Sequence, residues 1–99
     1  PAGMSPAWYK YPVVLPEGVD RDRVRARLQE EHAIEAGSLY WPPVHLMPVF
    51  QKKLGTKPGL CPKAERTLLR QLCPPMHAAV SDADAERAAR AFIDVVSSM

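Results

Sequence analysis

The sequence has few of the features that mark secreted, membrane or nucleic-acid-binding proteins. Its two cysteines are too few for a disulfide framework in a chain of 99 residues. No apolar run approaches the roughly 20 residues that span a bilayer, and no secretory signal pattern opens the chain. The net charge is only +2, with acids and bases interspersed, which gives little support for nucleic acid or a membrane surface as a partner. We therefore expect a cytoplasmic protein.

The two cysteines are expected to be free thiols. Cys61 and Cys73 occur in a chain without a secretory signal, where a disulfide is uncommon. A metal site built from them with His45 and His77 is disfavoured, because prolines break the register between Cys73 and His77 and no C-x-x-C pair is present. We expect no metal, and we interpret His77 as shaping the turn before the last helix.

The composition is that of one folded domain. Hydrophobic residues make up 46% of the chain and charged residues 24%, the balance of a globular protein with one modest core. Eleven prolines, about twice the usual share, divide the chain into short elements. Residues 1–7 are interpreted as a linker or a cleavage remnant, and residues 8–99 as the domain.

The first part of this domain alternates extended and helical patterns. Aromatic and β-branched residues predict a strand over 8–15, placed at a sheet edge because Pro12 cannot donate to a ladder. Asp20 is a good N-cap for a surface helix that ends near residue 31 or 32, with a narrow apolar stripe including Val24 and Leu28. Its arginines at 21–27 are interleaved with acids, so we expect them to form a solvated face. Residues 34–40 then predict a second extended segment, with a turn or bulge at Gly37.

The second part is mainly helical. Residues 49–54 predict one or two helical turns that end at Gly55. Pro62 opens a helix whose leucine spacing extends to Leu72, before two prolines end it. Ser81 caps a last helix that has acidic residues in its first turn. Its expected apolar stripe consists of Ala85, Ala88, Ala89, Phe92 and Val96. The fold class is therefore α+β, with a small antiparallel or mixed sheet covered by helices.

The least ordinary segment is the proline-rich stretch 37–50. Aromatic residues, a histidine and prolines in one loop restrict the unfolded chain and favour a rigid presentation of Tyr40, Trp41 and His45. A loop of this kind is typical of a binding surface. Trp41 is interpreted as a packing residue, and Glu65 as a charge favoured by the helix dipole rather than a catalytic acid.

At three places the sequence resembles the DegT, DnrJ, EryC and StrS family of sugar aminotransferases, which depend on pyridoxal phosphate (PLP). The family has a tyrosine and prolines before His-Leu-Gln-Pro, a Pro-x-Ala-Glu segment that opens a helix, and Leu-Pro-Leu-His before a final helix. The matching residues are Tyr40, Pro42, Pro43, His45, Leu46, Met47 and Pro48, then Pro62, Ala64 and Glu65, then Pro75, Met76, His77, Ser81 and Asp82. The order and spacing agree over about residues 8–96.

Three positions depart from the family pattern. Met47 stands in place of the glutamine, Leu39 where histidine is frequent, and Pro74 in place of leucine. A thioether cannot replace the amide's hydrogen bonds, so the resemblance does not carry a substrate contact of that glutamine over to Met47.

The resemblance implies the C-terminal small domain of a fold-type I PLP aminotransferase. It further implies that Tyr40 and His45 contact a keto-sugar or related carbonyl substrate, and that the partner is a PLP-binding large domain, in cis or in trans, within a dimeric enzyme. The Schiff-base lysine and the phosphate cradle belong to that large domain, so we expect no cofactor in this chain and no catalysis by it alone. None of the five lysines lies in a sequence context that suits PLP.

Two alternatives remain open. The first is a non-catalytic protein-interaction module derived from the same domain, which would expose an apolar patch of several hundred Å². The second is an unrelated small-molecule binder, which would need an enclosed pocket of at least ~300 Å³.

Overall fold

The computed structural model describes all residues from 1 to 99, and two capped helices form most of its packed part. Helix α1 spans Arg21–His32. Its N-cap is Asp20, whose carboxylate accepts hydrogen bonds from the backbone N–H groups of Asp22 and Arg23. The helix ends at His32 and is capped by Ala33, which has a left-handed conformation. The cap and the end predicted from the sequence are both confirmed.

Helix α4, Asp82–Ser97, begins with a complete capping box. The Ser81 hydroxyl accepts from the backbone N–H of Asp84, and the Asp84 carboxylate accepts from the backbone N–H of Ser81. The predicted apolar stripe is partly wrong, because Ala85 and Ala89 are exposed. The buried face instead consists of Ala91, Phe92 and Val95, with Ala88 and Val96 partly buried.

The sheet is smaller than the sequence pattern predicts. Strand β1, Val13–Val14, pairs antiparallel with strand β2, Gln71–Leu72. The predicted strand over 8–15 is therefore too long, because Pro12 has no N–H for the ladder and Trp8 has a positive φ of 51°. The second predicted extended segment contributes only an isolated bridge between Gly37 and Cys73.

Three short helices occupy the middle of the chain. They are the 3₁₀ helix η1 (Val44–Leu46), α2 (Pro48–Leu54) and α3 (Pro62–Leu69). Gly55 ends α2 with a φ of 65°, as predicted. The helix predicted to reach Leu72 ends at Leu69, since Gln71–Leu72 pairs with β1 and tertiary pairing overrides the leucine period.

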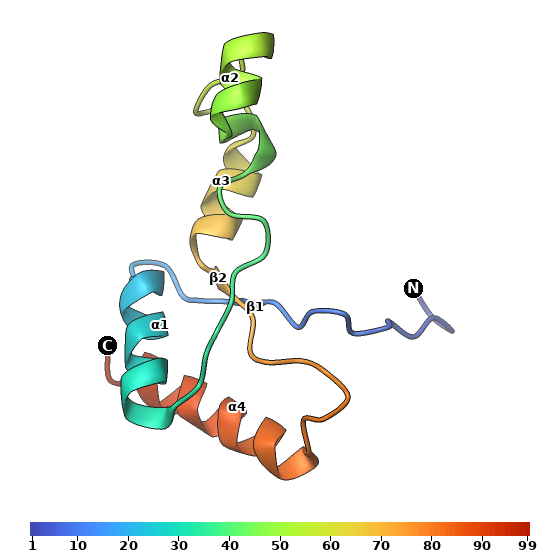
Figure 1. The fold of residues 1–99 in the computed structure, drawn as a ribbon, viewed down its shortest axis with the longest axis vertical. Helices are drawn as coiled ribbons and strands as arrows, with labels where there is room; N and C mark the ends of the chain where they lie inside the picture. The colour runs from blue at the N-terminus through green and yellow to red at the C-terminus, as the bar shows by residue number, and fades with distance from the viewer.

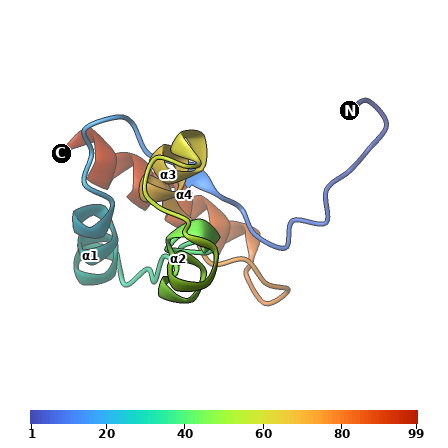
Figure 2. The same ribbon diagram turned by 90° about the horizontal axis from the view of Figure 1, so that it is seen from above.

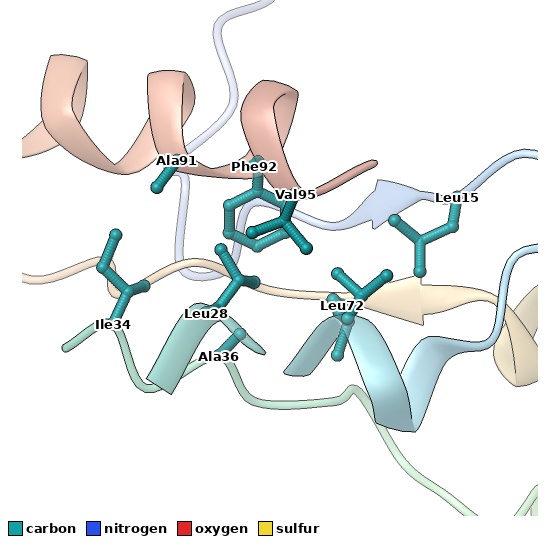
Figure 3. Close-up of a cluster of buried hydrophobic side chains, with 9 residues drawn as sticks. Leu15, Leu28, Ile34, Ala36, Leu72, Ala91, Phe92 and Val95 are labelled. Atoms are coloured by element: carbon teal, nitrogen blue, oxygen red, sulfur yellow. The ribbon is translucent and has the colours of Figure 1, made fainter. Parts of the chain in front are cut away.

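One hydrophobic core lies between α1, α4 and the small sheet (Figure 3). Leu28 and Val24 of α1 are fully buried, as are Leu72 of β2 and Val95 of α4. Figure 3 shows the side chains of Phe92 and Val95 pointing from α4 toward Leu28 and Leu72. The nine core residues are Leu15, Val24, Leu28, Ile34, Ala36, Leu72, Ala91, Phe92 and Val95.

The helices η1, α2 and α3 project from this core as an arm, which we define as residues 44–69 (Figures 1 and 2). No residue of the three arm helices is buried. Five large apolar side chains of the arm are instead 49–71% exposed. They are Val44, Val49, Leu54, Leu60 and Leu69. The arm is therefore stabilised by local contacts and leaves an apolar surface uncovered.

The extended shape appears in the dimensions of the chain. Its radius of gyration is 15.8 Å, whereas a compact domain of this length has about 13 Å. Its accessible surface is 7225 Å², against about 5,600 Å² for a typical monomer of 11.0 kDa. The difference is about twice the area of roughly 800 Å² that one partner buries in a standard interface. None of the helices is long and apolar enough to cross a membrane.

Candidate functional site

The Tyr40 loop, which we define as residues 37–43, leaves the core beside β2 and leads into the arm. Gly37 and Cys73 exchange two backbone hydrogen bonds of 2.9 and 2.7 Å where the loop begins. Tyr40 has a φ of 50°, in the left-handed region, and its side chain is 70% exposed. The peptide bond between Trp41 and Pro42 is cis. Tyr40 is thus presented to the outside by a loop whose first residue is fixed to the core.

Trp41 packs against an arginine of α1. The guanidinium carbon of Arg21 lies 4.8 Å from the centroid of the Trp41 ring, within the range of a cation–π contact. Arg21 is only 8% exposed, which corrects the prediction of a solvated face for all arginines of this helix. Arg27 departs from it too, since it is half-buried and donates to the hydroxyl of Ser98 at 2.8 Å. Trp41 is 40% exposed, so its ring packs on one side and remains uncovered on the other.

His45 is engaged within the arm. Its Nε2 donates to Oε1 of Glu65 at 2.8 Å, and the same oxygen accepts from the backbone N–H of Gly59 at 2.8 Å. The side chains of His45 and Glu65 are 11% and 24% exposed. One carboxylate therefore joins η1, the loop after α2 and the first turn of α3, a role that goes beyond the dipole charge predicted for Glu65.

The environment of Glu65 favours its ionised form. The hydrogen bond from His45 is the main cause that lowers the pKa of this carboxyl below its ordinary value, and the backbone N–H groups of Gly59 and Cys61 act in the same direction. Partial desolvation opposes the shift but does not cancel it. At neutral pH the carboxylate is therefore charged and holds the histidine, which suits a structural tie rather than a proton donor.

Gln71 contacts the Tyr40 loop although its sequence context does not single it out. It is 2% exposed, and its side-chain oxygen accepts from the backbone N–H of Leu39 at 2.7 Å. An amide among leucines at helical spacing is normally solvent-facing, so only the pairing of β2 reveals that this side chain is buried. Sequence reasoning missed the contacts of Gln71 and Arg21, as it missed the pairing of His45 with Glu65.

The other candidate residues lie apart from one another. His77 Nδ1 accepts from the backbone N–H of Ala79 at 3.3 Å, consistent with its predicted role in the turn before α4. Cys61 is exposed and Cys73 is buried, and both are free thiols. No three histidine, cysteine or acidic side chains gather as metal ligands would.

The hollows of the surface differ from a small-molecule pocket. One lies along α1 and the segment that follows it, and it is an open groove with charged walls. Its polar lining residues are Asp22, Arg25, Gln29 and Glu35. Pockets that enclose small molecules are mostly apolar and bury most of the ligand, which this groove does not do.

Comparison with known proteins adds a family to this geometry. The sequence profile of the DegT/DnrJ/EryC1/StrS aminotransferase family matches residues 2–93. The spore coat polysaccharide biosynthesis protein SpsC of Bacillus subtilis (strain 168) is 32% identical over 93 residues, which cover 91% of this chain and 24% of SpsC. The chain thus spans about a quarter of the length of that relative. No solved structure matches this chain.

Proposed function

The chain belongs to the DegT/DnrJ/EryC1/StrS aminotransferase family, and from this membership we propose that it is the C-terminal small domain of a PLP-dependent aminotransferase. The enzyme acts on a keto-sugar or a related carbonyl compound in the cytoplasm. The domain packs against a PLP-binding large domain, closes over the active site and orients the substrate. SpsC is named for spore coat polysaccharide biosynthesis, and this name supports a carbohydrate substrate.

The residues of this chain do not fit PLP by themselves. A lysine that forms a Schiff base is activated by desolvation or by a neighbouring cation. Lys10, Lys52, Lys53, Lys57 and Lys63 are all exposed to water, so none of them is desolvated in this way. We therefore assign the cofactor to the large domain and derive no chemical step from this chain.

The uncovered arm is the observation that carries the proposal. Its apolar side chains lack a core to pack against, although the arm is built from regular helices. The surface in excess of a compact monomer, to which the exposed N-terminal residues 1–12 also contribute, is of the size that an interface buries. We assign the large domain as the partner that covers the arm, because the relative contains about three times as much chain outside the matched part as within it. The enzyme is proposed to be a dimer of such two-domain subunits.

Within this assembly, Tyr40 and His45 are the proposed substrate contacts. Tyr40 offers an exposed hydroxyl on a loop anchored to the core. His45 takes part through Nδ1, because Nε2 is engaged by Glu65. Their contribution is positioning, which lowers the barrier by fixing the geometry of the reactants rather than by transferring a proton.

The proposal is tested by kinetics of the enzyme that contains this chain, joined to or mixed with its PLP-binding domain. Amino transfer to a panel of keto-sugars and related carbonyl compounds is measured for Tyr40→Ala, with Tyr9→Ala as the matched control, since Tyr9 is 76% exposed but lies outside the loop. We expect Tyr40→Ala to raise KM about tenfold, the loss of one hydrogen bond, and Tyr9→Ala to have no effect. Equal KM values for both variants and the parent would refute the substrate role. An assembly that binds its partner but performs no amino transfer would point to the interaction module instead.

A second measurement uses the 99-residue chain alone. We expect the visible absorbance of added PLP to remain that of the free compound. A new absorbance band that borohydride fixes onto one of the five lysines would show that the cofactor has been assigned to the wrong domain.

A further inference from the structure

We propose that Gln71 and Arg21 are positioning residues that hold the Tyr40 loop on the core, one on each side of Tyr40. The inference rests on the proposed role of Tyr40 in substrate binding and deepens it. Both side chains are buried, and neither belongs to the segments that match the family motifs. Their proposed role is to fix the direction in which the side chain of Tyr40 points.

Gln71 holds the side of the loop that precedes Tyr40. Its side-chain oxygen accepts from the backbone N–H of Leu39 at 2.7 Å, and its Nε2 donates to the sulfur of Cys73 at 2.8 Å. The N–H of Leu39 belongs to the peptide between Ser38 and Leu39, so this bond fixes the chain one residue before Tyr40. Gln71 lies on β2, next to the fully buried Leu72, so the anchor is part of the core itself.

The hydrogen bonds of Gln71 extend an existing backbone connection. Gly37 exchanges two hydrogen bonds with Cys73, so residues 37 and 39 are both tied to the end of β2. A buried amide without partners is unfavourable, and the loop backbone supplies the partner that this one needs. Gln71 and the loop therefore stabilise each other in one arrangement.

Arg21 holds the side of the loop that follows Tyr40. Its guanidinium lies over the ring of Trp41 at 4.8 Å and donates through Nη1 to the carbonyl of Leu68, near the end of α3, at 3.4 Å. The side chain of Asp22 accepts from the same guanidinium at 3.0 and 3.1 Å. The arginine thus bridges α1, the loop and the base of the arm. A planar guanidinium that stacks and donates at once suits this position better than an ammonium group.

The backbone of Tyr40 explains why two anchors are needed. A φ of 50° is unfavourable for a residue with a side chain, and such conformations persist only where the surroundings hold them. The Tyr40 side chain, 70% exposed, provides little of this support by its own packing. The residues before and after it are held instead, by Gln71 and Arg21. Neither is a substrate ligand, because they are only 2% and 8% exposed.

The test compares Gln71→Met, which keeps the length of the side chain but removes its hydrogen bonds, with Gln29→Met, the same change on an exposed glutamine of α1. The first readout is hydrogen exchange of the Leu39 amide in the 99-residue chain. We expect exchange about tenfold faster in Gln71→Met, after correction for global stability, and no change in the control. The second readout is amino transfer by the assembled enzyme, where KM rises about fivefold and kcat changes less.

Arg21 provides an independent pair of variants. In a Trp8→Phe background Trp41 is the remaining tryptophan. We expect its fluorescence emission to shift to longer wavelength in Arg21→Met, because the indole ring becomes more mobile and more exposed to water. Arg21→Lys keeps a cation near the ring, so its emission wavelength and its KM should lie between those of Arg21→Met and the parent. A general loss of structure would not be rescued by the lysine. If Gln71→Met does not fold, these variants decide the question with the same kinetic readout.

The outcomes separate this inference from the proposed function. A folded Gln71→Met chain with wild-type exchange at Leu39 overturns the positioning role. If Tyr40→Ala raises KM but Gln71→Met and Arg21→Met leave it unchanged, the positioning role also fails while the proposed function stands. If the Leu39 amide and the Trp41 emission respond but Tyr40→Ala leaves KM unchanged, the two anchors are supported and the substrate role of Tyr40 is rejected.

Discussion

Replacing one leucine of the core and one of the arm tests the division of this chain into two unequal parts. Leu28 is fully buried between α1 and α4, whereas Leu54 at the end of α2 is 71% exposed. Leu28→Ala removes buried methyl groups and leaves a cavity, which costs about 2–5 kcal/mol in well-packed cores. Leu54→Ala removes groups that are mostly in water already, so we expect a change within about 0.5 kcal/mol.

The stability lost in Leu28→Ala is expected to be a large part of the total free energy of unfolding. Domains of this size unfold with about 5–15 kcal/mol, and this chain buries only 13 residues, which places it toward the lower end. A loss of about 2–5 kcal/mol at about 4–8 °C per kcal/mol lowers the Tm by roughly 8–40 °C. We therefore expect Leu28→Ala to be partly unfolded near 37 °C and Leu54→Ala to melt with the parent chain.

The assay is urea unfolding of the 99-residue chain followed by far-ultraviolet circular dichroism, with both variants measured at one protein concentration. The reasoning would be refuted if Leu54→Ala lost as much stability as Leu28→Ala, because the arm would then be part of the cooperative core. Equal midpoints for Leu28→Ala and the parent would equally refute the assignment of the core.

Three further predictions use the same chain. Ser81→Ala breaks the capping box of α4 and should lower stability by about 1 kcal/mol in urea unfolding, while Ser5→Ala in the exposed N-terminal segment should not. The pKa of Glu65 is lower in the folded chain than the ordinary carboxyl value of 4.5, so its carboxylate stabilises the fold fully above that value. This stabilisation is lost as the pH falls through the lowered folded pKa, and Glu65→Gln should therefore flatten the dependence of stability on pH in that acidic range. A thiol reagent should label exposed Cys61 at once and buried Cys73 only on unfolding, with the label detected by mass spectrometry. Rapid labelling of both thiols would contradict the burial of Cys73.

Local rules predicted the elements whose ends are set by their own residues. Asp20 and Ser81 begin α1 and α4, and Gly55 ends α2, because a cap or a left-handed glycine acts within one turn of the chain. The strand over 8–15 and the helix to Leu72 were wrong in length. Both depend on the pairing of β1 with β2, which joins positions almost sixty residues apart and leaves no local pattern.

The candidate site shows the same division. The proline-rich composition around Tyr40 indicated a rigid, exposed loop, and the structure places Tyr40 at the surface. The partner of His45 could not be predicted, because Glu65 lies twenty residues away and its position in α3 suggested only a dipole charge. Gln71 was missed for a related reason, since an amide carries no sign of burial until its strand partner is known.

The location of the interior at one end of the molecule has a consequence for how this sequence is free to vary. Substitutions among the nine core residues are restricted by the need to fold, because each removes a large part of a small free energy of unfolding. Substitutions on the outer faces of α2 and α3 affect folding little, since those side chains are exposed when the chain is alone. In the proposed enzyme, only the fit to the neighbouring domain would restrain them. The residues of the arm should therefore change in evolution together with the residues of the surface that they contact.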